Sequence, residues 1–478
     1  MKRRLLLKSA AAGIAAAATH SLSQATCAQE PGNVTVNDFS GLNPVVVSGE
    51  VRPSTVEELK QAIERWEGPL SIGGGRFSMG GQVAAPHSLH VDMRGLDRVV
   101  SYLPEQHVIR VQAGITWRSI QDCIDRLDQS VKIMQSFSNF TVGGSLSVNC
   151  HGRYVGRGPL VNSVRALQLL LPDGRLVEAS RTENADLFRA VIGGYGGLGI
   201  VTEIELDLED NCRIERRVKK VSVEEYPDWF AKNILQSQQV VLHNADLTPP
   251  DFDQPKAISW VRTERRLTDD RRLVPRGLNY ATERNAIWAV SELPGGDTVR
   301  STVERSILDR LPMVVWRNFE ASKDTASVEP TPRTQSTYVL QEYFIPVKNF
   351  QSFTAAMAGI LKNPQTGAIN VSIRHAPADT TSLLSWAPVE VFCFVLYYKQ
   401  RVTDSAHRDV ELWTRELIEA ALSNEGRYYL PYRLHATLDQ FRRAYPEAND
   451  FAALKRRVDP QNRMRNLLWD RYLSSSAP

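Results

Sequence analysis

Three glycine-rich segments in the first 200 residues restrict most strongly what this chain can fold into. They cover residues 73–82, 141–152 and 193–199. Glycine has no side chain to obstruct positive φ angles, so such segments let the backbone approach a ligand closely. Successive free N–H groups form a concave site for an anion such as a pyrophosphate. The first segment is therefore predicted to hold an anionic ligand, and a structural turn is the alternative reading of the first two segments.

Two common nucleotide-binding motifs do not fit these segments. The first segment lacks the Lys-Ser/Thr pair that completes a P-loop. Residues 194–199 satisfy G-x-G-x-x-G, but a Rossmann fold needs a strand before that loop and a helix after it. Here a helix is expected over 186–192 and a strand over 200–208. The order is reversed, which excludes a simple NAD enzyme of the Rossmann type.

The apolar periodicity changes near residue 213. Before it, short strands alternate with short helices, including helices over 54–66, begun by a capping box of Ser54 and Glu57, and over 116–127. After it, we expect longer elements: helices over 224–236 and 404–421, and strands over 337–346, 368–375 and 389–398. A chain of 478 residues is too long for one ordinary core, so two domains are expected. The second is predicted to be α+β with an antiparallel sheet.

The N-terminus is typical of a bacterial export signal. Arg3 and Arg4 precede an apolar, alanine-rich run that ends near Ala18, and small residues follow up to Ala28. The paired arginines favour the twin-arginine route, which exports proteins already folded around a cofactor, so periplasmic or secreted localisation is expected. The alternatives are a retained membrane anchor and a lipoprotein attached at Cys27. No later stretch is long and apolar enough to suggest a transmembrane helix.

Charge and cysteine content exclude two classes of site. The formal charge is +3, but Lys2, Arg3, Arg4 and Lys8 lie within the export signal, and without them it is −1. A nearly neutral protein has no field to attract nucleic acid, so no such partner is expected. The five cysteines include no CxxC pair and no histidine at zinc spacing, so no metal site is predicted. A disulfide and buried free thiols both remain open for the exported chain.

The three segments, taken in order, resemble the FAD-binding domain of the vanillyl-alcohol-oxidase or PCMH superfamily. Residues 73–82 are similar to its pyrophosphate loop, 141–152 to its T-V-G-G…H-G segment, and 193–201 to its G-G-x-G-x-x-G-I-V run. Asp459, Pro460 and Asn466 resemble the tail of sugar-lactone and alditol oxidases. Residues 426–430 and 458–460 are most similar to the decaprenylphosphoryl-ribose oxidase family. The resemblance covers most of the mature chain.

The resemblance implies an α+β, two-domain PCMH-type fold, with two small α/β subdomains that bind FAD and an α+β substrate domain. It divides the chain into a signal peptide over 1–28, an FAD-binding domain over 38–212, a substrate domain over 213–425, and a C-terminal segment over 426–478 that returns to the FAD domain. It assigns FAD contacts to Gly73, Gly74, Gly75, Arg76, Phe77, Ser78, Gly81, Gln82, Thr141, Gly143, Gly144, Ser147, His151, Gly152, Gly196, Gly199, Val201 and Tyr429.

Two positions depart from the family pattern. Many relatives link FAD covalently through a histidine directly before the serine of the first loop, and Phe77 stands there in this chain. Phenylalanine cannot form that bond, so FAD is expected to be non-covalent unless Cys150 or another residue substitutes. The ribose oxidases have a lysine where Tyr432 stands here. A tyrosine acts as a base only when its pKa falls from about 10, so the substrate or the route of the proton is expected to differ.

The resemblance points to four catalytic candidates: His151, Gln341, Arg374 and Tyr432. His151 is placed near the flavin ring and Gln341 near the substrate. Strand alternation puts Arg374 and Asn370 on one face and His375 on the other, so Arg374 is a candidate to stabilise negative charge if that face lines the pocket. Structural roles are the alternatives: a hydrogen-bonded histidine, a surface ion pair for Arg374, packed tyrosines, and a buried Cys393 instead of an active-site one.

The implied activity is FAD-dependent oxidation of a CH–OH group of a sugar, lactone, polyol or related alcohol by hydride transfer. A small-molecule substrate and an electron acceptor such as oxygen, a quinone or a periplasmic carrier are the expected partners. Oxidation of a C–N bond or an oxidative cyclisation is a second enzymatic reading. A non-catalytic flavoprotein subunit and a flavin-free binding protein are the remaining hypotheses.

Overall fold

The computed structural model describes residues 33–292, 312–330 and 333–473. The predicted export signal therefore lies outside the described residues. Within these ranges, no helix combines the length and the apolar character needed to cross a membrane.

The first structural unit contains three sheets. A parallel three-stranded sheet has the order β3 (Gly49–Val51), β5 (Leu89–Asp92), β4 (Leu70–Gly73) and is followed in the chain by an antiparallel sheet. That second sheet has the order β10 (Leu176–Ser180), β9 (Val164–Leu170), β11 (Ile200–Asp210), β7 (Val108–Gln112), β6 (Val99–Leu103), with β8 (Gln129–Val131) also paired to β11. A short hairpin joins β1 (Val34–Val36) and β2 (Val45–Val47). Strand β11 alternates buried and half-buried residues, as expected for a strand with one face on the core.

The second unit is built on one antiparallel sheet of eight strands. Its order is β15 (Val314–Trp316), β12 (Arg213–Lys220), β14 (Lys256–Arg262), β13 (Val240–Leu247), β17 (Ala368–Ala376), β18 (Val391–Arg401), β16 (Ser336–Pro346), β19 (Arg427–Tyr428). The predicted antiparallel sheet of an α+β domain is thus confirmed. The chain passes from the sheet of β11 to the sheet of β12 between Asp210 and Arg213, where the sequence places a domain boundary.

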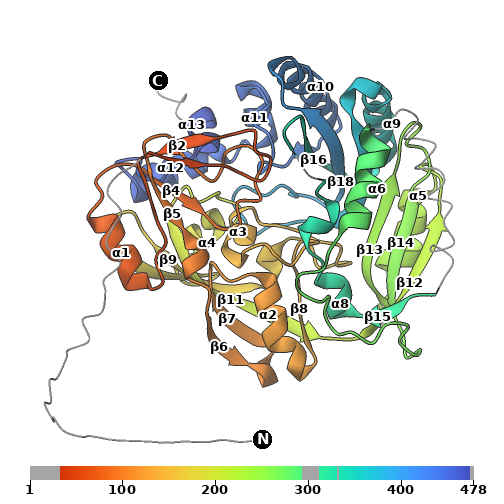
Figure 1. Cartoon of the computed structure of the whole chain (residues 1–478), viewed down its shortest axis with the longest axis horizontal. Helices are drawn as coiled ribbons and strands as arrows, with labels where there is room; N and C mark the ends of the chain where they lie inside the picture. The colour runs from red at the N-terminus through yellow and green to blue at the C-terminus, as the bar shows by residue number, and fades with distance from the viewer. Residues whose placement is uncertain (1–32, 293–311, 331–332, 474–478) are drawn as a thin grey trace, which may run out of the picture.

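Helices cover the outer face of this sheet. They are α5 (Tyr226–Phe230), which continues as a π-helical turn over Ala231–Leu235, α9 (Phe350–Leu361) and α10 (Asp404–Ser423). Figure 1 shows α9 and α10 beside β16 and β18. Phe353 of α9 packs edge-on against Phe394 of β18, with ring centroids 4.9 Å apart. Since the outer face is occupied by this apolar layer, polar residues on alternate positions of β16, β17 and β18 point toward the first unit.

The remaining helices are short, and one predicted helix start is corrected. They are α1 (Val56–Glu64), α2 (Trp117–Ile124), α3 (Val142–Ser147), α4 (Ala185–Val191), α6 (Ala281–Glu292), α8 (Arg317–Ala321), α11 (Leu438–Ala444), α12 (Ala448–Val458) and α13 (Leu467–Tyr472). The N-cap of α1 is Thr55, whose side chain accepts from Glu58 N–H, not Ser54. Ser54 instead donates to the Glu58 carboxylate, so the bond pattern lies one residue later than predicted.

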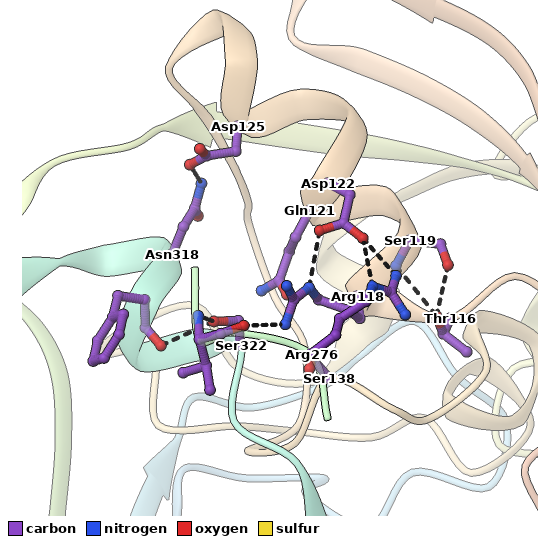
Figure 2. A network of polar contacts seen from close by, with 12 residues as sticks. Thr116, Arg118, Ser119, Gln121, Asp122, Asp125, Ser138, Arg276, Asn318 and Ser322 are labelled. Carbon is purple, nitrogen blue, oxygen red and sulfur yellow. Dashed lines mark hydrogen bonds and ion pairs between the residues drawn. The ribbon is translucent and has the colours of Figure 1, made fainter. Parts of the chain in front are cut away.

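A polar network joins the two units along α2 (Figure 2). Asp122 accepts hydrogen bonds from Arg118 on the same helix and from Arg276 of the second unit. One turn further on, Asp125 accepts from Asn318 Nδ2 of α8 at 2.7 Å. Arg118 and Arg276 lower the pKa of Asp122 against the opposing effect of its burial. These contacts fix the second unit against the first.

Candidate functional site

A cavity of about 390 Å³ lies between the two units. All three glycine segments line it, together with side chains from strands β16, β17 and β18 and from the C-terminal residues 429–432. Most predicted cofactor residues are on its wall: Gly74, Gly75, Arg76, Phe77, Ser78, Gln82, Thr141, Gly143, Gly144, Ser147, His151, Gly196, Gly199, Val201 and Tyr429. The structure places Gly73, Gly81 and Gly152 behind that wall.

The first and second glycine segments touch at Gly74 and Thr141. Thr141 Oγ1 accepts a hydrogen bond from Gly75 N–H at 3.2 Å. A Cβ atom at position 74 would lie 2.2 Å from the same oxygen, closer than any real contact. Position 74 therefore requires glycine, because a side chain there would push the two ligand-facing loops apart.

The C-terminal segment fixes the third glycine loop. Three of its side chains donate to backbone oxygens of this loop: Trp469 Nε1 to Gly194 O at 3.1 Å, Asn466 Nδ2 to Tyr195 O at 2.8 Å, and Lys455 Nζ to Gly197 O at 2.9 Å. Such support offsets the strain at Tyr195, a non-glycine residue with a φ of 49°. The sequence signal for a C-terminal return was the tail motif around Asp459; Lys455 and Trp469 were not anticipated.

Phe77 belongs to an aromatic stack. Its ring lies on that of Phe140, with centroids 4.0 Å apart, and next to Phe39 at 5.1 Å. It offers no atom that can bond to a cofactor. Cys150 also lines the cavity, but burial raises the pKa of its thiol to about 12, so it is held in the unreactive protonated form.

His151 forms a buried pair with Glu342 of β16. Its Nε2 lies 2.5 Å from Glu342 Oε1, and each side chain is 3% exposed. Since a carboxylate only accepts hydrogen bonds, Nε2 carries the shared proton and Nδ1 remains without a partner. An imidazole in this arrangement can accept a proton at Nδ1 while the carboxylate stabilises the resulting charge.

The structure places Gln341 outside the cavity. On β16 the residues that line the cavity are Tyr338, Leu340 and Glu342, whereas Gln341 faces α10 and contacts Tyr398. Successive residues of a strand point to opposite faces, so a shift of one position exchanges the face. The missed signal was Glu342 itself, the only carboxylic acid in this strand.

Strand β17 supplies a polar part of the wall. Asn370, Ser372 and Arg374 line the cavity, and His375 points to the other face, where it pairs with Glu390 at 2.7 Å. This is the alternation predicted for these residues. Arg374 Nε is buried without a hydrogen-bond partner, and no ion pair joins Arg374 to a carboxylate among residues 33–292, 312–330 and 333–473.

The two C-terminal tyrosines differ in their contacts. Tyr429 donates to Val148 O at 2.7 Å, which ties the C-terminal segment to the second glycine segment. Tyr432 donates to Glu342 Oε2 at 3.4 Å, and Gln82 Nε2 donates to Tyr432 O at 2.9 Å. Burial, followed by the charge of Glu342, raises the pKa of Tyr432 well above its usual value. Tyr432 is therefore suited to donate a hydrogen bond and unsuited to act as a base.

The thiol of Cys393 is close to the pair. Cys393 is fully buried, stands opposite both Arg374 and Phe344 in the sheet, and its Sγ lies within 4.8 Å of ligand atoms of His151 and Glu342. No metal site was predicted here, because these three residues are far apart in the sequence. The four cysteines among the described residues are free thiols.

The donor set of the cavity fits a flavin dinucleotide. Buried polar atoms without partners face the space near the glycine segments, at Arg76 Nε and Ser136 Oγ, and on the opposite wall, at His151 Nδ1 and Arg374 Nε. Unpaired buried polar groups cost free energy, so a ligand that bonded to these four atoms would stabilise the folded protein. Glycine backbone at one end and aromatic rings further along suit a pyrophosphate and a flat ring system.

Comparison with known proteins agrees with this geometry. Residues 47–180 match the family model of an FAD binding domain. The chain is 20% identical to L-gulonolactone oxidase of Bos taurus over 420 residues, which is 86% of this chain and 91% of the relative. It is 26% identical to mitochondrial L-galactono-1,4-lactone dehydrogenase of Brassica oleracea over 210 residues, 43% of this chain and 35% of the relative. It is 28% identical to cytokinin dehydrogenase 3 of Arabidopsis thaliana over 181 residues, 36% and 35% of the two chains.

The last two alignments span only about a third of those relatives. The shared part is sufficient for the cofactor, because the glycine segments, their order and the cavity that they line are those of one type of domain. The chain therefore carries a PCMH-type FAD-binding domain, and its relatives among sugar-lactone oxidases and dehydrogenases and cytokinin dehydrogenases match the vanillyl-alcohol-oxidase superfamily.

Proposed function

We propose that this protein is an FAD-dependent oxidoreductase that oxidises a CH–OH group of a sugar, lactone, polyol or related alcohol, with FAD held non-covalently. The observation that carries the proposal is the His151–Glu342 pair, which stands in the same cavity as the glycine segments and leaves Nδ1 unpartnered. Similarity to sugar-lactone oxidases and dehydrogenases supports the substrate class.

Each residue of the site has a separate role in the proposed reaction. FAD, when bound, supplies the acceptor for the hydride that leaves the substrate carbon. His151 Nδ1 takes the hydroxyl proton of the same carbon, and Glu342 stabilises the imidazolium that forms. Tyr432 keeps Glu342 oriented through its hydroxyl. Arg374, whose Nε lacks a partner, stabilises the negative charge that develops beside it.

Two measurements test this proposal on the purified protein. The visible spectrum before and after acid precipitation shows whether the flavin leaves with the supernatant, as Phe77 leads us to expect. Anaerobic mixing with a panel of lactols, polyols and simple alcohols then shows which compounds bleach the flavin absorbance. Colour that stays in the pellet contradicts non-covalent binding, and a flavin that only a chemical reductant bleaches favours the non-catalytic alternative.

Oxidation of a C–N bond is the second candidate. Glu342 could pair with a substrate ammonium group, and the chain is similar to a cytokinin dehydrogenase over its FAD side. Amines belong in the same panel. A ketone or lactone product supports the leading proposal, and release of an amine supports this one.

We also propose that residues 1–28 direct the folded protein through the twin-arginine route to the periplasm. The paired Arg3-Arg4 and the alanine-rich run that follows support it. Replacement of both arginines by lysine should leave the protein in the cytoplasm, as fractionation and immunoblotting would show.

A further inference from the structure

The inner face of the eight-stranded sheet contains a second polar group beyond the His151–Glu342 pair. One row of directly opposed residues crosses four strands of the sheet. It consists of Glu342 on β16, Val395 on β18, Ser372 on β17 and Asp246 on β13. Directly opposed residues point to the same face, so all four face the cavity side. Neighbouring strands are about 4.8 Å apart, which places Ser372 about 10 Å from Glu342.

Asp246 organises the far end of this row. Asn244 Nδ2 donates to its Oδ1 at 3.2 Å and Asn370 Nδ2 donates to the same oxygen at 3.5 Å. Ser372 is a third donor to the carboxylate, and Lys256 stands opposite it on β14. Burial raises the pKa of Asp246, and these donors and the charge of Lys256 act in the opposite direction.

This arrangement fixes what the wall presents to a ligand. A carboxylate can only accept hydrogen bonds, so the Nδ2 group of Asn370 and the hydroxyl hydrogen of Ser372 must point to Asp246. The remaining oxygens, Asn370 Oδ1 and Ser372 Oγ, then face the cavity as hydrogen-bond acceptors. In agreement, Asn370 Oδ1 is buried and has no hydrogen-bond partner among the described residues, although Asn370 lines the cavity.

We infer that Asn370 and Ser372, oriented by Asp246, form a distal subsite that accepts hydrogen bonds from substrate hydroxyl groups about 10 Å from Glu342. Such a subsite selects a neutral substrate of disaccharide length and disfavours one with a carboxylate or phosphate at that end, since neither anion can donate. Asn370 and Ser372 contact the substrate, and Asp246 is a positioning residue. The inference rests on the proposed oxidation of a sugar-type alcohol.

The test compares three sugars in anaerobic rapid mixing. They are D-glucose, cellobiose, and the disaccharide in which glucuronic acid replaces the non-reducing glucose of cellobiose. For each, the concentration of half-saturation and the limiting rate of flavin bleaching are measured. In the wild type, cellobiose should half-saturate at a concentration about tenfold below glucose, the effect of one or two added hydrogen bonds, and the acidic disaccharide should show no such gain.

Variants separate the subsite from the reacting centre. Asp246→Ala and Asn370→Leu should raise the half-saturation concentration of cellobiose by about tenfold relative to that of glucose in the same variant. Asp251→Ala, an exposed acid in the turn after β13, is the matched control and should change nothing. If Asp246→Ala does not fold, Asn370→Leu decides.

Three results would overturn the subsite: equal half-saturation by glucose and cellobiose, equal binding of the acidic disaccharide, or variants that still bind cellobiose normally. Each of them leaves the proposed function in place if glucose bleaches the flavin. If none of the sugars bleaches it, the proposed sugar oxidation fails, and the subsite fails with it.

Discussion

His151 Nε2 lies 2.5 Å from Glu342 Oε1, although 191 positions separate the two residues in the chain. One residue comes from the second glycine segment and the other from β16, which lies next to the edge strand β19 of the eight-stranded sheet. The pair thus exists only when the two units are joined, and it determines which nitrogen of His151 is available to a substrate.

The first prediction concerns this pair. His151→Ala should slow flavin reduction by about 10²-fold to 10⁴-fold, the usual contribution of a general base. Glu342→Gln should cause a smaller loss, because the amide leaves the imidazolium that forms without an opposing charge. Rapid mixing measures both rates. Glu390→Gln, which alters the His375 pair on the far face, is the control, and an unchanged rate in Glu342→Gln would contradict the assigned role.

The second prediction concerns the contact between the first two glycine segments. Gly74→Ala places a Cβ 2.2 Å from Thr141 Oγ1, and relief of such overpacking costs about 1–3 kcal/mol. FAD affinity, measured by titrating the apoprotein, should therefore fall by roughly tenfold to a hundredfold. Gly359→Ala in α9 meets nothing within 4 Å and should bind FAD normally, with stability raised by up to about 1 kcal/mol. Equal FAD affinity in the two variants would show that the contact between Gly74 and Thr141 is unimportant for FAD binding.

The third prediction concerns the C-terminal support of the third glycine loop. Lys455 Nζ donates to Gly197 O, Met464 O and Asp459 Oδ2 in a buried environment. Lys455→Met leaves these acceptors unsatisfied, so unfolding free energy should fall by about 3 kcal/mol or more, and FAD affinity should fall with it. Lys348→Met removes an exposed pair with Glu425 and should cost at most about 1 kcal/mol. Chemical denaturation of the two apoproteins and titration with FAD provide the comparison. A Lys455→Met protein of normal stability that binds FAD weakly would restrict the role of Lys455 to the third glycine loop.

The fourth prediction is a pH dependence of stability. His243 is bonded to Tyr226 and Ser259, and burial lowers its pKa to about 3. In the unfolded chain His243 takes up a proton near pH 6.5, whereas in the folded protein it does not. The contribution of His243 to the free energy of unfolding is therefore fully present above pH 6.5 and is lost as the pH falls toward 3. The loss from this residue is about 2 kcal/mol at pH 5. Denaturation of His243→Gln at pH 7 and pH 5 should show a smaller difference in stability than denaturation of the wild type.

Local patterns of the sequence determined much of the FAD side. The glycine segments appear at their predicted places because a lack of side chains acts on the backbone directly, whatever the rest of the fold. The alternation of Asn370, Arg374 and His375 was also predictable, since it follows from strand geometry alone. The predicted order of a helix, a glycine loop and a strand is confirmed for the same reason. The three elements are α4, residues 193–199 and β11.

Only the tertiary structure decided which of these residues share a site. Periodicity gives the two faces of β16 but not which face meets the cavity, and that choice separates Glu342 from Gln341. The partners of His151, of the third glycine loop and of Asp246 come from segments far away in the chain, brought together by the packing of two sheets and the return of the C-terminal segment. Sequence thus determined the local backbone and the cofactor class, and long-range packing determined the protonation chemistry and the shape of the substrate wall.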